Sequence, residues 1–192
     1  MFAVGFAMVF RFHPARVVYF PPAPANAPPG APGSAPHLAP GPAPESAPPL
    51  AAAPAAASGM SAAEERILAD VNQARANYGL NPLVPMAALT AVARAHSRDM
   101  ATHDYFAHDS PGHGSAEQRI AAAGIHYLMM GENIYTETYP NSEGLAQRAV
   151  QGWLHSPPHR KNMLSPSFNR TGIGIARTPG GTSYVTQDFV EQ

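Results

Sequence analysis

The chain has 192 residues, no cysteine and a formal net charge of −1 at pH 7. This length allows one ordinary domain with a tail, or two very small domains. The near-neutral charge argues against a nucleic-acid partner, and the lack of cysteine excludes disulfides, thiolate catalysis and cysteine-ligated metal sites.

The amino terminus carries a short apolar run. Residues 2–10 are apolar, and Arg11 and Arg16 follow them. Nine residues are too few to cross a membrane, and a secretory signal has its positive charges in front of the apolar run. Residues 1–20 are therefore interpreted as a remnant or misassigned export signal, with a short membrane-associated or disordered end as the alternative.

A proline-rich stretch follows. Residues 1–57 hold 14 of the 22 prolines and only three charged residues, Arg11, Arg16 and Glu45. Alternating Pro, Ala and Gly cannot bury a core and favour extended, polyproline-like conformers. We predict a disordered linker over residues 21–60, acting either as a spacer for an exported domain or as a tail without a role. The folded domain is assigned to residues 61–192.

The first half of this domain shows two helical patterns. Ser61 and Glu64 form a capping box that predicts a helix over 62–78. Apolar residues at helical spacing predict a second helix from Leu89 to near Thr102. Residues 103–114 mix aromatic residues, histidines, Pro and Gly, and are expected to form a loop.

The second half mixes helices and strands. A short capped helix is expected from Ser115 to Gly124, and a strand over 125–130 that the GENI sequence at 131–134 breaks. A third long helix is capped at Asn141 or Ser142 and ended by Pro157. Strands over 171–177 and 183–190 form a hairpin. These elements predict an α+β fold, a small antiparallel sheet between helices in three layers.

Seven of the nine histidines lie in this domain. There is no H-E-x-x-H, G-x-S-x-G or glycine-rich phosphate loop, so the zincin, α/β-hydrolase and nucleotide-binding classes lack their signatures. His96 is expected in the core, bonded to a neighbouring segment, while His126 and His155 are expected at the surface.

His108 and His159 lie in predicted loops, as does Glu132. Two neutral imidazoles and one carboxylate form a common ligand set for zinc, with water at the fourth position. The alternative is a buried His–Glu pair that only fixes loops to the sheet. Spacing alone leaves both interpretations open.

Seven blocks resemble a known family in their order. They are NQARANYGLNPL (72–83), AHSRDMA (95–101), YFAHDSP (105–111), GENI (131–134), WLHSPPHRKNML (153–164), GIGIA (172–176) and YVTQDF (184–189). Together they resemble the bacterial SCP-like domain of the CAP superfamily, named for cysteine-rich secretory proteins, antigen 5 and pathogenesis-related 1. The resemblance spans residues 62–190.

This resemblance implies an α-β-α sandwich, secretion, and a cleft with a His/Glu tetrad that binds a divalent cation in several relatives. The family's two histidines match His108 and His159, and its GEN glutamate matches Glu132. The fourth member, a glutamate in animal and plant relatives, matches Ser156, which is a poor zinc ligand. Arg160 is expected to pair near the cleft, with plain exposure as the alternative.

We therefore expect an exported, non-catalytic module, secreted or in the cell envelope, that binds a small ligand or a divalent cation such as zinc. A metal-dependent peptidase or esterase using Glu132, and a module that binds protein or wall polymer, are the alternatives. The partner is expected to be a small ligand, lipid or cell-wall component, and the chain a monomer without a transmembrane span. The predicted cleft comprises His108, Glu132, Asn133, Ser156, His159 and Arg160.

Overall fold

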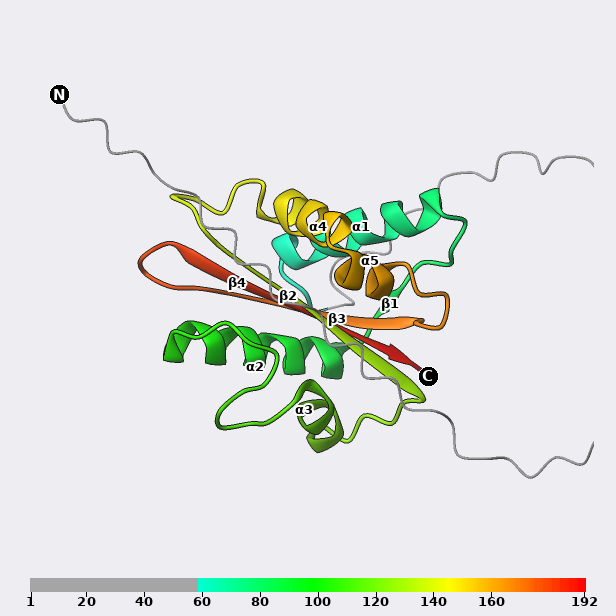
Figure 1. The fold of residues 1–192 in the computed structure, drawn as a ribbon, viewed down its shortest axis with the longest axis horizontal. Helices are drawn as coiled ribbons and strands as arrows, with labels where there is room; N and C mark the ends of the chain where they lie inside the picture. The colour runs from blue at the N-terminus through cyan, green and yellow to red at the C-terminus, as the bar shows by residue number, and fades with distance from the viewer. Residues whose placement is uncertain (1–58) are drawn as a thin grey trace, which may run out of the picture.

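A computed structural model describes residues 59–192 as three layers, a sheet with helices on both faces (Figure 1). The strands are β1 (Val84–Pro85), β2 (Met129–Thr138), β3 (Arg170–Arg177) and β4 (Thr182–Glu191). The helices are α1 (Ala62–Asn77), α2 (Ala87–His103), α3 (Ala116–Ala122), α4 (Leu145–His155) and α5 (Pro157–Met163). This confirms the predicted α+β, three-layer fold. The predicted segment 1–20 and nearly all of 21–60 lie outside the described residues.

The sheet has the strand order β1-β3-β4-β2. β4 pairs antiparallel with both β2 and β3, as expected for the predicted hairpin. β1 adds two residues parallel to β3, so the sheet is mixed rather than purely antiparallel. Pro85 has no N–H to donate, which is consistent with so short a strand at the edge of the sheet.

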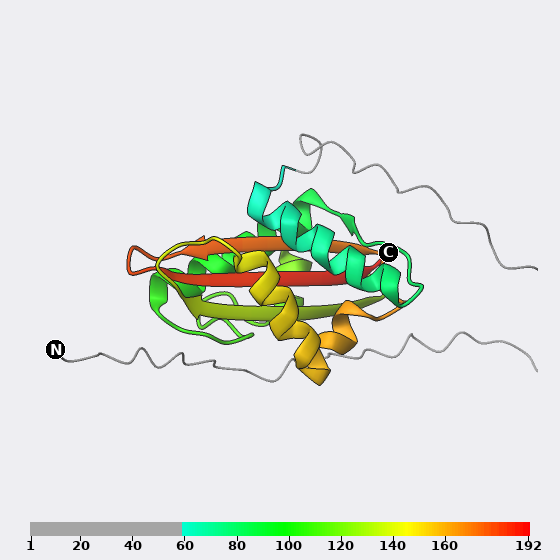
Figure 2. The ribbon, with the colours of Figure 1, turned by 90° about the horizontal axis from the view of Figure 1, so that it is seen from above.

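One face of the sheet is covered by α1, α4 and α5, and the other by α2 and α3 (Figure 1). Seen from above, α1 and α4 lie across the strands (Figure 2). α1 begins as predicted, because the side chain of Ser61 accepts from Glu64 N and that of Glu64 accepts from Ser61 N.

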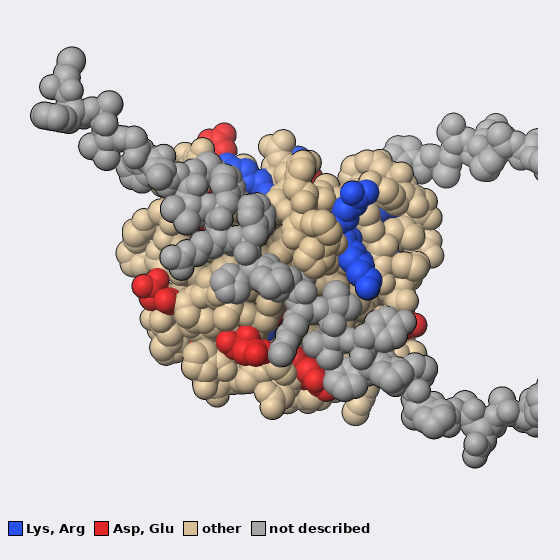
Figure 3. All heavy atoms as spheres, in the orientation of Figure 1, with Lys and Arg blue, Asp and Glu red and all other residues tan. Residues whose placement is uncertain are grey.

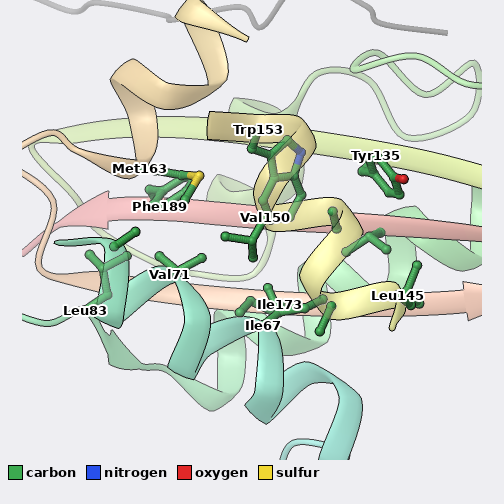
Figure 4. Close-up of a cluster of buried hydrophobic side chains, with 14 of the residues drawn as sticks. Ile67, Val71, Leu83, Tyr135, Leu145, Val150, Trp153, Met163, Ile173 and Phe189 are labelled. Carbon is green, nitrogen blue, oxygen red and sulfur yellow. The ribbon is translucent and has the colours of Figure 1, made fainter. Parts of the chain in front are cut away.

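The main core lies between α1, α4 and the sheet (Figure 4). Ile67 and Val71 from α1 meet Val150 and Trp153 from α4 above Ile173 of β3. Trp153 is 1% exposed, and its indole N–H donates to the Ile134 carbonyl at 3.1 Å. This contact attaches α4 to the edge strand β2.

On the other face, α2 lies directly on β3. A Cβ at Gly172 would lie 2.2 Å from the carbonyl carbon of Leu89, and one at Gly174 would lie 2.2 Å from the nitrogen of Arg94. The alternating glycines of β3 therefore let the helix backbone approach the sheet. This close contact fixes the position of His96, which α2 carries into the interior.

The predicted strand over 125–130 is wrong, because β2 begins at Met129 and includes the GENI sequence. Gly131 lies at a tightly packed position, since an added Cβ would lie 3.1 Å from the Phe168 ring and 3.2 Å from the Asn162 side chain. Glu132 and Asn133 have polar side chains typical of a loop, yet both are buried with polar partners. A pattern based on polarity could not predict that these two polar side chains are buried.

The predicted cap at Asn141 or Ser142 is also wrong, since α4 starts at Leu145 after Gly144. α4 ends at His155, just before Pro157, as expected. The sequence analysis missed α5, which begins with Pro157 at its first position. A proline there needs no N–H partner and has the φ of a helix, so the same residue that ends one helix begins the next.

Candidate functional site

The loop after α2, the helix α3 and the strand β2 bring three side chains together. His108 Nδ1 lies 2.7 Å from Glu132 Oε1, and Arg119 donates to Glu132 Oε2 at 2.6 Å. Arg119 also donates to the main-chain oxygens of His108 (2.9 Å) and Gly114 (2.7 Å). Arg119 thus holds both the main chain of His108 and the carboxylate that orients its ring.

Glu132 is 2% exposed and carries charge inside the protein. Burial raises the pKa of its carboxyl, but the hydrogen bond from His108 and the charge of Arg119 outweigh burial and lower it. The carboxylate is therefore ionised at neutral pH and forms a buried ion pair with Arg119. The ionised carboxylate accepts the Nδ1–H of His108, which leaves Nε2 as the lone-pair nitrogen.

His159 comes from the other side of the sheet edge, on α5. Its Nδ1 lies 2.8 Å from Ser156 Oγ, and its main-chain oxygen accepts from Asn133 Nδ2 at 3.1 Å. Burial, with a smaller contribution from nearby His108, lowers the pKa of His159 to about 4. The ring is therefore neutral at pH 7.

The Nε2 atoms of His108 and His159 are both buried, and neither has a hydrogen-bond partner among the described residues. Buried polar atoms are nearly always paired, so these two imidazole nitrogens, like the Nδ1 atom of His96, need an explanation. In the rings of His108 and His159 the Nδ1 atom is already occupied, which leaves Nε2 free to act as a ligand atom. Within residues 59–192, no three His, Asp or Glu side chains form a group able to hold a metal ion.

Two residues of the predicted cleft, Asn133 and Arg160, have their side chains engaged elsewhere. Asn133 is fully buried, and besides His159 it contacts Asn162, whose Nδ2 donates to Asn133 Oδ1 at 2.9 Å. It holds α5 against β2. Arg160 is exposed and donates to the hydroxyl of Tyr78 at 2.7 Å, so the expected pairing near the cleft is wrong. Its neighbour His159 points inward, and one step along the helix turns Arg160 outward.

His96 lies beneath the candidate site and is 1% exposed. Its Nε2 lies 3.0 Å from the Ala107 carbonyl, which confirms the predicted core histidine bonded to a neighbouring segment. Burial lowers the pKa of His96 to about 4, against an opposing contribution from Glu132. His96 therefore adds no charge to this layer at pH 7.

The sequence matches a family model over residues 68–189, that of the Cysteine-rich secretory protein family, CAP. The chain belongs to this family. The uncharacterized protein YkwD of Bacillus subtilis (strain 168) is 36% identical over 135 residues, 70% of this chain and 49% of that protein. The uncharacterized membrane protein YlbC of the same strain is 35% identical over 67% of this chain and 34% of its own length. The CAP chain thus spans half or less of these relatives.

Solved structures show the same CAP fold. An extracellular protein containing an SCP domain from Bacillus anthracis has a TM-score of 0.60 and 33% identity, covering 68% of this chain and 40% of that one. An outer surface protein of Borrelia burgdorferi has a TM-score of 0.61 at 18% identity over 68% and 92% of the two chains. These relatives are extracellular or surface proteins. Within residues 59–192 of the CAP chain, no helix is long and apolar enough to cross a membrane.

Sequence reasoning missed two polar residues of the CAP site, Arg119 and Asp188. Arg119 lies in the short capped helix, outside all seven blocks of the resemblance. Asp188 pairs with Glu132 across β2 and β4, and it is 1% exposed with no hydrogen-bond partner for either oxygen among the described residues. Burial, together with Glu132, raises its pKa well above the usual value. An acidic residue inside a predicted strand was the available signal.

Proposed function

We propose that this CAP domain is a binding module that holds a divalent cation, or a small ligand bound through one, at His108 and His159. The observation that carries the proposal is the pair of buried, unpartnered Nε2 atoms. Neutral imidazole nitrogen is among the commonest zinc ligands in proteins. Two histidine ligands leave coordination positions for water or for an oxygen atom of a ligand.

Glu132 and Ser156 act as orienting residues in this proposal. Histidines that bind metals usually donate their other N–H to a carboxylate, a carbonyl or another acceptor, which fixes the ring. Glu132 Oε1 and Ser156 Oγ occupy these positions at 2.7 and 2.8 Å from the Nδ1 atoms. Because both oxygens of Glu132 are engaged, its predicted role as a direct ligand becomes the role of a support for His108. The serine at the fourth tetrad position then supports His159 in the same way.

The electrostatics at His159 favour the binding of a cation. The His159 ring is neutral near neutral pH and carries a single proton, so a metal ion does not have to displace a second one. Arg119 neutralises Glu132 beneath the site. A bound ion would supply a positive charge and open positions for an anionic or oxygen-bearing ligand. The fold relative NaASP2, with a TM-score of 0.51 and 15% identity, has been solved with Zn²⁺.

We also place the domain outside the cytoplasm, secreted or held at the cell envelope. The extracellular protein of Bacillus anthracis and the outer surface protein of Borrelia burgdorferi support this placement. The apolar run at residues 2–10 would serve as part of the export signal. Fractionation of expressing cells tests it, and a chain that stays wholly in the cytoplasm would contradict it.

Calorimetric titration of ZnCl₂ into the full chain tests the binding proposal. We expect one-to-one binding that weakens at least tenfold in His108→Ala and in His159→Ala. His155→Ala is the matched control, because His155 is exposed and its Nδ1 lies 2.7 Å from the Gln151 carbonyl. Binding that is equal in all four proteins, or absent from the unmodified chain, would overturn the proposal.

A further inference from the structure

A groove of about 470 Å³ opens on the outer side of α5, away from the candidate site. Leu154, Pro157, Leu164 and Pro166 give it apolar walls, and Arg160 and Lys161 are its cations. This volume lies within the range of natural ligand pockets. The combination of apolar walls and two adjacent positive charges fits an occupant that is apolar and carries a negative group.

The two cations have no carboxylate partner among the described residues, where neither takes part in an ion pair. Arg160 is held by a neutral group, the Tyr78 hydroxyl, and its guanidinium lies 5.5 Å from the centroid of that ring. Figure 3 shows Lys and Arg atoms over the position of α5 in Figure 1, with no acidic atoms beside them in that view. The positive charge of the groove is thus uncompensated and partly pre-oriented.

The chain itself contains a segment of matching chemistry. Glu45 is the one acidic residue among the first 57, and it lies in the sequence PAPESAPPL at residues 42–50. Proline-rich peptides lose little entropy on binding, because their extended conformation is largely preformed, and they typically bind in apolar grooves. The glutamate would supply the negative charge that the groove lacks.

The linker is long enough to reach the groove. Its end is fixed at Gly59, whose carbonyl accepts from Arg94 at 2.8 Å. From there, the 16-residue helix α1 leads to Tyr78, which contacts Arg160, a path of roughly 24 Å at 1.5 Å per residue. The 14 residues from Glu45 to Gly59 span up to roughly 43 Å as a polyproline helix.

We propose that residues 42–50 bind in the α5 groove of their own chain, with Glu45 paired to Lys161 and Arg160. The connection is covalent, so the segment has a high effective concentration at the groove and even a weak site is occupied. The linker then folds back on the domain, and only the part before residue 42 acts as a spacer. His159 precedes Arg160 on α5, so this one helix carries a residue of the candidate site on its inner side and the bound segment on its outer side.

A zero-length carbodiimide cross-link tests this proposal, because Lys161 is the only lysine in the chain. The reagent activates a carboxylate, and an amine in contact with it then forms an amide bond. In the full chain at low salt, we expect a monomeric product in which Glu45 is joined to Lys161, identified by mass spectrometry of its proteolytic peptides. Its yield should fall severalfold in 0.5 M NaCl.

The control variants separate this contact from random coupling. Glu45→Gln should abolish the product, whereas Glu143→Gln, which removes an exposed carboxylate of the folded domain, should leave its yield unchanged. No Lys161 product, a product with another carboxylate, or one found only in dimers would overturn the proposal. None of these outcomes depends on a metal, so they are independent of the zinc titration.

Discussion

Glu132 shares its carboxylate between the imidazole of His108 and the guanidinium of Arg119, and all three groups are largely removed from water. Removing one partner of a buried ion pair leaves an uncompensated charge, which typically costs about 3–5 kcal/mol. We therefore expect Glu132→Gln to lower the free energy of unfolding by about 3 kcal/mol, since it leaves Arg119 charged and unpaired. Urea unfolding followed by the fluorescence of Trp153 measures this loss.

The double variant Glu132→Gln with Arg119→Met provides the control. It removes both charges and keeps a side chain of similar length at residue 119, so its loss should be smaller than the sum of the two single losses. Additive losses would show that the two groups do not interact.

Substitution of Asp188 should not lower the free energy of unfolding, in contrast to substitution of Glu132. Burial and the neighbouring Glu132 raise its pKa in the folded state, so ionisation in the unfolded chain disfavours folding as the pH rises above about 4. Asp188→Asn removes the cost of ionising a buried carboxyl, so the variant should be as stable as the original chain, or more stable, at pH 7. A loss as large as that of Glu132→Gln would contradict the raised pKa.

The buried histidines predict a loss of stability in acid. The pKa of His96 falls from 6.5 to about 4 on burial, so the unfolded chain binds more protons between these values and stability falls as the pH falls through this window. His96→Gln should flatten the slope by up to about 1.4 kcal/mol per pH unit, as measured by urea unfolding at several pH values. His126→Gln, at an exposed position, should leave the slope unchanged.

At the scale of elements, the contact between α2 and β3 brings the two backbones very close together. This contact positions His96. Gly172→Ala would place a Cβ 2.2 Å from the Leu89 backbone, which neither element can move to accommodate without shifting the other. We expect a loss of about 2–3 kcal/mol in the free energy of unfolding, typical of overpacking. Gly180→Ala should cost well under about 1 kcal/mol, because its nearest neighbour is Thr178 Oγ1 at 3.8 Å. Equal effects would show that α2 does not rest on β3 as described.

Elements with local signals were predictable from the sequence. The capping box at Ser61 and Glu64 located the start of α1, and the two strands predicted over 171–177 and 183–190 located the β3–β4 hairpin. β2 was misplaced because it buries Glu132 and Asn133, whose partners come from distant segments. α5 was missed because Pro157 both follows one helix and begins another. For β2, tertiary contacts decided the structure, and local propensity gave no indication of them. For α5, the proline was interpreted only as the end of α4, although it also suits the first position of a helix.

At the scale of the whole molecule, the ordered blocks predicted the family and the three-layer fold. They also selected His108, Glu132 and His159, which the structure places at one edge of the sheet around β2. The blocks did not reveal Arg119, because two of its contacts come from folding the histidine loop back on α3 and the third comes from Glu132 on β2. The blocks did not reveal the contact between Ser156 and His159 either, because it depends on the short helix α5, which carries His159.

The central claim is that the Nε2 atoms of His108 and His159 are the ligand atoms, with their Nδ1 atoms held by Glu132 and Ser156. Long-range ¹H–¹⁵N spectra of the histidine rings in the full chain test this claim directly, before and after one equivalent of Zn²⁺. We predict that only these two Nε2 signals move and that both Nδ1 atoms keep their protons. Zinc-dependent shifts at other histidines, with these two Nε2 signals unchanged, would contradict the account.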